Sequence, residues 1–317
     1  MPHRFDKRTS VAGMRVFVTG GTGAIGGYAV PALIAAGHDV TAVARSDAKA
    51  AVLQRQGATA VKVSLFDRDA LTAAFRGHTA VVNLASSLPT PARFMLKSAW
   101  EECHRIRIQG SATVIDAALA AGVGRVVQES VAMIYRDGGA RWIDEDWPVD
   151  RYPIAAGNHG AEASNRRFGE NGRDAVVLRF GFFYGPGAGH SETMMRLARR
   201  RVTFQAGKPG SYMSSIHLED AAAAVVAALE AAPGTYNVVD DCPVTATQHS
   251  AAMAAAVGVR PWLTPPGRAA LLLGDRATSM TRSLRVNNAR LRAATPWRTR
   301  YPSVWDGYRA MVGAQGW

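Results

Sequence analysis

The stretch M-R-V-F-V-T-G-G-T-G-A-I-G, residues 14–26, decides the fold. Its first half is an apolar run that predicts a buried strand, and its second half carries glycines at positions 20, 21, 23 and 26. Apolar residues then recur at helical spacing as far as Gly37, which ends the predicted helix. A strand, a glycine-rich turn and an amphipathic helix in this order are typical of a βαβ unit that holds the pyrophosphate of a dinucleotide.

Glycine is needed three times in such a loop: for the tight turn, for the approach of the pyrophosphate, and for packing of the helix on the strand. The phosphates then meet free N–H groups at the start of the helix. The alternative is a glycine-rich turn without a ligand, and the βαβ context favours the binding loop. The expected cofactor-binding residues are Gly20, Gly21, Thr22, Gly23, Ala24 and Ile25.

Strands and helices alternate through the first half of the chain. Strands are predicted over residues 40–44, 60–63, 80–84, 125–128 and 175–180, and helices over 48–56, 69–75, 98–121 and 161–168. This alternation predicts an α/β fold with a doubly wound parallel Rossmann sheet and right-handed crossovers. Beyond residue 180 the pattern loosens, with helices expected over 221–229 and 244–257 and a strand over 235–239.

This pattern suggests a division of the chain into a flexible leader and two larger parts. We expect the leader over residues 1–13 and the dinucleotide-binding domain over 14–182, with 216–242 returning to it. Residues 183–215 and 243–317 are then expected to form a smaller C-terminal, substrate-binding lobe. The segments 86–97 and 282–292 are expected to border the substrate cleft.

Composition excludes several other classes. No apolar run approaches the roughly 20 residues that cross a bilayer, and the first 13 residues lack the apolar core of a signal peptide. Two cysteines provide neither a disulfide framework nor a metal cluster, so we expect a cytoplasmic protein without a metal or membrane partner. The net charge of +12 comes from scattered basic residues, unlike a nucleic-acid footprint, and no nucleic-acid partner is expected.

The end of the second strand distinguishes the two nicotinamide cofactors. NAD-binding proteins place an acidic residue there to hold the ribose 2′-hydroxyl. Here Ala44 takes that place, with Arg45 beside it, and Asp47 is interpreted as a helix N-cap. An arginine accommodates the 2′-phosphate that a carboxylate would repel, whereas a merely solvated Arg45 is the alternative. The sequence therefore predicts NADP(H) in preference to NAD(H).

With T-G-G-T-G-A-I-G in place, the chain resembles the short-chain dehydrogenase/reductase superfamily, in its extended or atypical, NAD-dependent epimerase/dehydratase-like branch. The resemblance runs from residue 14 to about residue 305, through V-V-N-L-A (81–85), R-V-V-Q-E-S-V-A-M-I-Y (125–135), L-R…Y-G-P (178–186), H-L-E-D-A (217–221) and Y-N-V (236–238). It implies further cofactor contacts from Leu65, Leu84, Ala85 and Arg179.

The chain departs from that family at the catalytic Tyr-x-x-x-Lys pair. Alignment on Glu162 puts Ile154 and Asn158 at the two places, so the resemblance predicts a subgroup that lacks this pair. Arg107 stands where the family has a helix Asn, and Glu129 replaces a small hydroxyl residue. We expect Arg107 and Glu129 to form a partly buried ion pair beneath the site.

Residues near the ends of the predicted strands are candidates to replace the missing tyrosine and lysine. Ser130 ends a central strand, where doubly wound folds place their sites, and the expected substitute acids are Tyr135, then Tyr184 and Tyr152. Each of these hydroxyls has a structural alternative, because Ser and Tyr side chains commonly satisfy backbone or core groups. The expected substrate-binding residues are Ser87, Tyr152, Asn158, His217 and Arg282.

These residues leave three functions open. The first is an NADP(H)-dependent oxidoreductase of a small organic substrate, with hydride transfer and a non-standard proton donor. The second is an epimerase, isomerase or dehydratase that retains its cofactor, and the third is a non-catalytic NADP(H)-binding sensor or regulatory protein. Substrate identity, reaction direction, and the choice between a monomer and a homodimer stay open.

Overall fold

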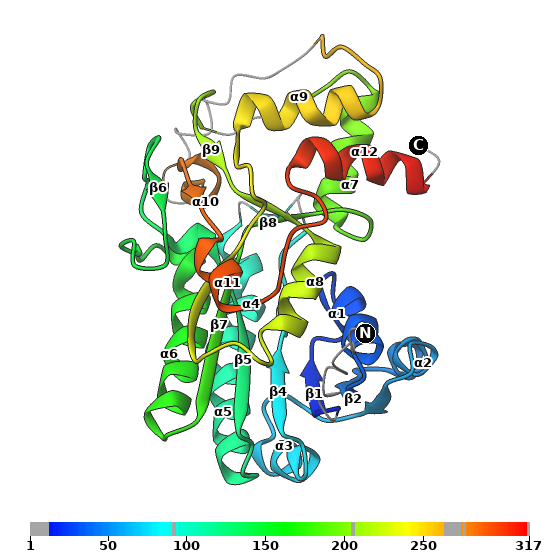
Figure 1. Ribbon diagram of the computed structural model, residues 1–317, viewed down its shortest axis with the longest axis vertical. Coiled ribbons are helices and arrows are strands. Elements are labelled where there is room, and N and C mark those ends of the chain that lie inside the picture. The colour runs from blue at the N-terminus through cyan, green and yellow to red at the C-terminus, as the bar shows by residue number, and fades with distance from the viewer. Residues whose placement is uncertain are drawn as a thin grey trace, which may run out of the picture.

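A seven-stranded parallel sheet forms the centre of the computed structural model, which describes residues 13–90, 93–94, 96–203, 207–262, 274 and 277–315. The strand order is β11-β7-β5-β4-β1-β2-β3, and each neighbouring pair is parallel. The strands are β1 (Arg15–Thr19), β2 (Asp39–Val43), β3 (Thr59–Val61), β4 (Ala80–Asn83), β5 (Arg125–Val131), β7 (Asp174–Phe180) and β11 (Gly234–Val238). The predicted doubly wound parallel sheet is confirmed (Figure 1).

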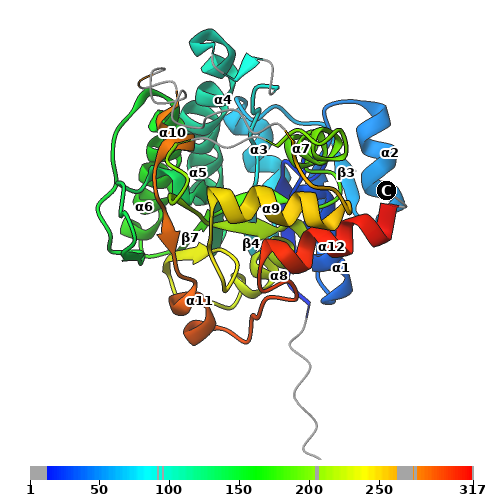
Figure 2. The same ribbon diagram turned by 90° about the horizontal axis from the view of Figure 1, so that it is seen from above.

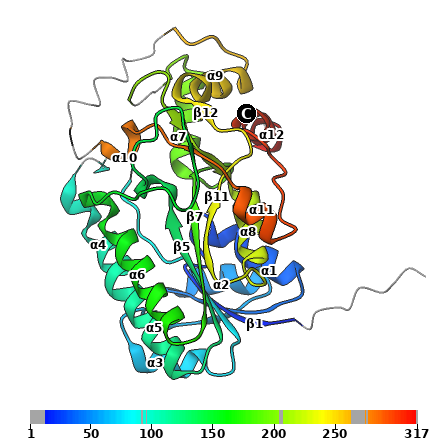
Figure 3. The same cartoon turned by 60° about the vertical axis from the view of Figure 1, so that its left-hand side comes forward.

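Helices cover both faces of this sheet. Helices α1 (Gly26–Ala35) and α8 (Leu218–Ala227) pack together on one face, and α3 (Arg68–Phe75), α5 (Ser111–Ala120) and α6 (Ala156–Glu170) cover the other. Figure 3 shows α5 and α6 on one side of the strands and α1 and α8 on the other. Helix α2 (Asp47–Arg55) follows β2. The strand order reverses between β1 and β4, the place where folds of this kind bind dinucleotides.

A row of polar side chains joins the strand ends beside that reversal. Thr19, Asn83 and Gln128 stand in register on β1, β4 and β5. The Asn83 Nδ2 group donates to Gln128 Oε1 at 2.8 Å and to Ser111 Oγ at 3.2 Å, and Thr19 donates to Asn83 Oδ1. These hydrogen bonds hold the three strand ends together, and they therefore fix where the following loops begin.

The helix predicted over residues 98–121 is interrupted. A 3₁₀ turn (Lys97–Trp100) leads into α4 (Glu101–Arg105), a π-helical turn (Ile106–Gly110) follows, and α5 begins at Ser111. Hydrophobic periodicity does not reveal a π turn, because it adds a single residue to an otherwise helical pattern. Such turns often occur at functional sites, and this one carries Arg107.

Other boundaries differ from the predicted ones by less. Strand β5 continues to Val131, α6 begins at Ala156, and α8 begins at Leu218 with His217 as its N-cap. The helix predicted from residue 244 is a strand, β12 (Val244–Thr245), followed by α9 (Ala246–Ala256), because a Thr245–Gln248 capping box starts the helix there.

Helices α7 (Gly189–Arg199), α9 and α12 (Val304–Gln315) lie above the sheet in Figure 1, and Figure 2 shows α9 beside α12. Their shared core includes Tyr184, Met195, Met253 and Tyr308. Three short sheets connect the loops: β8 (Phe182–Tyr184) with β10 (Ser215–His217), β9 (Tyr212–Met213) with β12, and β6 (Trp142–Ile143) with β13 (Arg285–Val286). The remaining elements are 3₁₀ turns at Ala132–Ile134 and Pro153–Ala155 and helices α10 (Thr278–Thr281) and α11 (Ala289–Ala294).

Two sequence predictions fall partly outside the described residues: the leader over 1–13 and the cleft border over 86–97. The division into a dinucleotide-binding domain and a substrate lobe stays a prediction. Among the helices that the structure describes, none is both long and apolar enough to cross a membrane.

Candidate active site

The glycine loop between β1 and α1 has the shape of a phosphate cradle. Gly20 adopts a φ of +71°, and a Cβ there would lie 2.5 Å from the Leu84 carbonyl oxygen. A Cβ on Gly26 would lie 2.1 Å from the Gly20 carbonyl oxygen. Any side chain at these two positions would push the loop away from β4 or from the helix, so both must be glycine.

The start of α1 leaves backbone donors free for an anion. Its N-cap, Ile25, has no side-chain capping bond, and the first turn carries no acidic residue. Gly23 and Ala24 are exposed beside it, and Thr22 is half-buried. Because the first N–H groups of a helix have no partner within it, this loop fits a pyrophosphate.

The end of β2 presents a cation and no carboxylate. Ala44 is buried and Arg45 is exposed, without a hydrogen bond or ion pair to the residues that the structure describes. Ser46 is the N-cap of α2, accepting from the Lys49 N–H at 3.3 Å, so the predicted capping role of Asp47 is wrong. Asp47 lies in the first turn and pairs with Lys62 at 2.5 Å. The acidic side chain closest to Arg45 in the sequence is therefore already paired.

The remaining predicted cofactor contacts lie in two different settings. Leu84 and Ala85 follow β4 beside Gly20, and half-buried Leu65 follows β3. Arg179, on β7, is instead buried in a bidentate pair with Glu162, at 2.9 Å from Nε to Oε1 and 2.7 Å from Nη2 to Oε2. Its guanidinium is committed within the protein.

Ser130 and Tyr135 belong to the same buried network. The Ser130 hydroxyl donates to Glu162 Oε1 at 2.6 Å, and the side chain is fully buried. The Tyr135 hydroxyl donates to Asn237 Oδ1 at 2.7 Å and accepts from Arg179 Nη1 at 2.9 Å. Burial raises the pKa of Tyr135 to about 12, although Arg179 acts in the opposite direction. Both hydroxyls thus have partners inside the protein.

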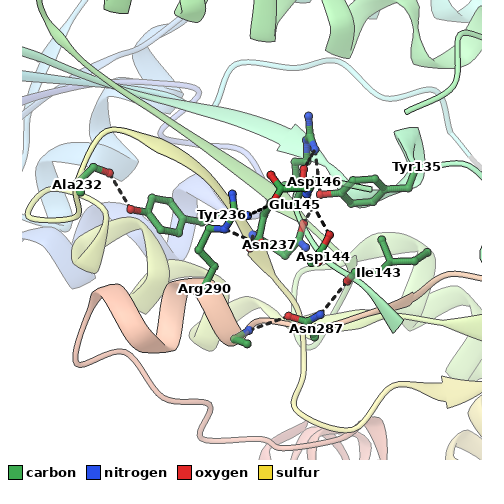
Figure 4. A network of polar contacts seen from close by, with 12 residues as sticks. Tyr135, Ile143, Asp144, Glu145, Asp146, Ala232, Tyr236, Asn237, Asn287 and Arg290 are labelled. Atoms are coloured by element: carbon green, nitrogen blue, oxygen red, sulfur yellow. Dashed lines mark hydrogen bonds and ion pairs between the residues drawn. The ribbon is translucent and has the colours of Figure 1, made fainter. Parts of the chain in front are cut away.

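This network continues behind Tyr135. Figure 4 shows Tyr135, Asn237 and Glu145 close together in this network, and Glu145 Oε1 accepts from the Asn237 backbone N–H at 2.8 Å. Arg290 Nε pairs with Glu145 Oε2 at 3.3 Å and Arg290 Nη2 with Asp146 at 2.6 Å. Burial raises the pKa of Glu145. The sequence did not single out Glu145, because no local pattern marks a carboxylate that accepts a hydrogen bond from the backbone of a distant strand.

The other two tyrosines are also engaged. The Tyr184 hydroxyl donates to the Ser303 carbonyl at 3.2 Å, and the Tyr152 hydroxyl to the Met133 carbonyl at 2.7 Å. Burial raises the pKa of Tyr184 well above its ordinary value and that of Tyr152 to about 12. Arg282 stacks over Tyr152 at 4.6 Å and pairs with Asp150.

His217 also has a structural contact. Its Nδ1 accepts from the Glu219 N–H at 3.2 Å, which caps α8, and its ring lies 4.1 Å from that of Tyr301. Burial lowers the pKa of His217 to about 4, so the ring is neutral near pH 7. Ser87 is half-buried in the loop after β4. The catalytic and substrate-binding roles of these residues stay predictions.

An ion pair lies at the carboxyl end of β5. Arg107 Nη2 pairs with Glu129 Oε1 at 2.8 Å, which confirms the predicted pair, and Arg107 Nη1 donates to Asn158 Oδ1 at 2.6 Å. All three side chains are buried. Burial is the largest single influence on the pKa of Arg107, and it lowers that pKa. Attraction to Glu129 and the hydrogen bond with it act in the opposite direction, and overall the pKa is raised.

Apolar side chains surround Ile154, at the place where the family has its tyrosine. They form one cluster: Trp100, Cys103, Ile134, Tyr152, Ile154 and Ala155, with Phe94, Val131 and Val149 packed against it. Phe94 and Trp100 meet edge to face at 4.9 Å. These buried side chains pack on one another, so an apolar core cluster occupies the place where the family has its tyrosine.

Comparison with known proteins places these features in a family. Residues 16–239 match the model of the NAD dependent epimerase/dehydratase family. The chain is 34% identical over 309 residues to a Streptomyces 3-diazoavenalumate denitrifying reductase, covering 93% of this chain and 99% of the relative. It is 30% identical over 243 residues to the 4-hydroxy-2-methyl-3-oxo-4-farnesyl-3,4-dihydroquinoline-1-oxide ketoreductase of Stigmatella aurantiaca, covering 73% of this chain and 70% of the relative.

Solved structures share the fold over nearly the whole chain. The human epimerase family protein SDR39U1 with NADPH has a TM-score of 0.81 at 24% identity, covering 95% of this chain and 99% of that one. The Thermus thermophilus UDP-glucose 4-epimerase complex with NAD has a TM-score of 0.77 at 24% identity, covering 95% of this chain and 98% of that one. At these identities the likeness concerns the fold.

Proposed function

Since the chain is an oxidoreductase of the NAD dependent epimerase/dehydratase family, we propose that it is an NADP(H)-dependent reductase of a small organic substrate. The observation that carries the cofactor preference is the end of β2. There buried Ala44 replaces the usual carboxylate, and the exposed Arg45 has no hydrogen bond or ion pair with the described residues. A 2′-phosphate would meet a cation at that place, and Glu102, the carboxylate whose pKa Arg45 helps to lower, is already paired with Arg105.

Arg45→Ala tests this preference directly. We expect the wild-type protein to bind NADPH at least about tenfold more tightly than NADH, because a charge-assisted bond contributes roughly 1.5–3 kcal/mol. In Arg45→Ala the two dissociation constants become similar. Arg55→Ala, at the other end of α2, removes another exposed arginine and leaves the ratio unchanged. Equal dissociation constants in the wild-type protein contradict the proposal.

The chain lacks the tyrosine that serves as proton donor in the family. Ile154 stands at the family's tyrosine position, and the hydroxyls of Tyr135, Tyr152 and Tyr184 donate to acceptors within the protein. A bound nicotinamide dinucleotide supplies a hydride. A substrate that needs only this hydride would suit the site, whereas a ketone also needs a proton on its oxygen.

An arenediazonium group is such a substrate. Hydride adds to the ring carbon, the C–N bond breaks, and N₂ leaves with the bonding pair, so that no proton is consumed. The Streptomyces relative is named for denitrifying reduction of a diazo compound, and it is 34% identical to this chain over 93% of its length. We therefore take an aromatic diazo compound as the substrate class.

Turnover with an arenediazonium salt and with an aryl ketone of the same ring tests the substrate class. Consumption of NADPH with the diazonium salt, release of N₂, and deuterium transfer from C4-deuterated NADPH to the ring are expected. A rate greater with the ketone contradicts the substrate class. Cofactor binding without any turnover supports the sensor alternative, and substrate conversion without net NADPH consumption supports the cofactor-retaining epimerase, isomerase or dehydratase.

A further inference from the structure

Glu129, Arg107 and Asn158 carry an arrangement that the family's residue pattern does not explain. Glu129 lies near the end of β5, one residue beyond Gln128, which stands in register with Asn83 at the end of β4. Arg107 reaches it from the π-helical turn, and Asn158 from the first turns of α6. Three separate elements therefore bring polar side chains to one point at the carboxyl edge of the sheet.

Glu129 has a free oxygen. Its Oε1 is held by Arg107, whereas its Oε2 is buried without a hydrogen-bond partner among the residues described. A buried carboxylate oxygen without a partner is costly, and a native protein rarely keeps one without a reason. A ligand hydroxyl would satisfy it.

Asn158 has a directed donor. A guanidinium can only donate, so the 2.6 Å contact from Arg107 Nη1 requires the amide oxygen of Asn158 to face it. The Nδ2 group must then point away from Arg107. Arg107 thus orients both neighbours. Glu129 keeps an acceptor oxygen without a protein partner among the described residues, and Asn158 directs its donor away from Arg107.

The position of Glu129 and Asn158 matches the nicotinamide half of the cofactor. The residue after β2 marks the adenosine side of the strand reversal, and the glycine loop marks the pyrophosphate, so the other half of the dinucleotide extends towards β4 and β5. Resting on the proposed function, we propose that Glu129 Oε2 and Asn158 Nδ2 bind the ribose diol of the nicotinamide half, with Arg107 as a positioning residue. Each hydroxyl of a diol both donates and accepts, which suits one free acceptor and one free donor.

Binding of two nucleotides by calorimetry tests the proposal. NADP⁺ contains the nicotinamide ribose, whereas adenosine 2′,5′-bisphosphate lacks it and reports on the loop and Arg45 alone. Glu129→Gln and Asn158→Ala are expected to weaken NADP⁺ binding about tenfold each and to leave binding of the bisphosphate within about twofold of the wild type. Asp116→Asn, which breaks the half-exposed pair with Arg167 between α5 and α6, serves as the matched control and changes neither affinity.

Retained binding of the bisphosphate shows that a variant is folded. If Glu129→Gln does not fold, Asn158→Ala, which removes no charge, decides the matter alone. Unchanged NADP⁺ affinity in a folded variant, or an equal loss for both nucleotides, overturns this inference and leaves the proposed function intact. If the wild-type protein binds neither nucleotide, the proposed function itself fails.

Discussion

At the scale of single residues, the hydroxyls that the sequence marks as candidate acids all have internal partners. Tyr135 shows why sequence could not reveal this: its acceptor, Asn237, lies 102 residues away in the chain. A residue type and its place on a strand can be predicted locally. A hydrogen-bond partner contributed by a strand far along the chain cannot.

Tyr135→Phe distinguishes a structural hydroxyl from a catalytic one. The change removes the donor to Asn237 Oδ1 in a fully buried site, so the free energy of unfolding should fall by about 1–3 kcal/mol. Turnover of the folded variant should stay within a few-fold of the wild type. Chemical denaturation and steady-state assays measure the two effects. A loss of kcat beyond a hundredfold, with stability preserved, would instead assign Tyr135 as the proton donor.

At the scale of elements, apolar strand runs and the glycine loop predicted the sheet well. The segment 98–121 was predicted less well, because the 3₁₀ and π turns keep nearly helical spacing of the apolar residues. The π turn matters for the site, since it places Arg107 against α6. Gly157 provides the room: a Cβ there would lie 3.1 Å from Arg107 Cβ and 3.2 Å from Arg107 Cδ.

Gly157→Ala tests the packing of α6 on this turn. An alanine at an open helix position usually adds about 1 kcal/mol to stability relative to glycine. Gly313 in α12, where a Cβ meets nothing within 4 Å, should show that gain as Gly313→Ala. At Gly157 the crowding of Arg107 should cancel the gain and weaken NADP⁺ binding. Equal stabilisation by the two substitutions, with unchanged NADP⁺ affinity, would show that Arg107 does not depend on this packing.

At the scale of the whole molecule, a buried carboxyl lies where the sheet meets the upper helices. Asp240 follows β11 and is buried, and neither of its oxygens makes a hydrogen bond of full geometry with the described residues, although the Tyr184 hydroxyl and the His217 backbone are close enough to favour its charged form. Burial raises the pKa of Asp240 well above its ordinary value near 3.8, with Asp220 acting in the same direction and Tyr184 against it. The folded protein therefore favours the protonated form.

Stability should therefore fall as the pH rises towards the folded-state pKa of Asp240. Because the folded-state pKa is raised, the stability associated with Asp240 is complete below the unfolded pKa and is lost as pH rises towards the folded pKa. Asp240→Asn should remove this loss, so its melting temperature should exceed that of the wild type by more at pH 8 than at pH 5. A gain of ~1 kcal/mol corresponds to roughly 2–4 °C for a protein somewhat smaller than this one. Thermal unfolding across this pH range measures the effect, and a variant less stable than the wild type at pH 8 would show that Asp240 does not destabilise the folded protein there.

We propose that the carboxyl edge of the sheet holds NADPH, with its 2′-phosphate at Arg45 and its nicotinamide ribose at Glu129 and Asn158. A crystal structure of the NADPH complex measures this most directly. We expect an Arg45 nitrogen within ~3.2 Å of a 2′-phosphate oxygen, and both Glu129 Oε2 and Asn158 Nδ2 at a similar distance from ribose hydroxyls. A 2′-phosphate directed away from Arg45, with the nicotinamide ribose remote from β5, would contradict it.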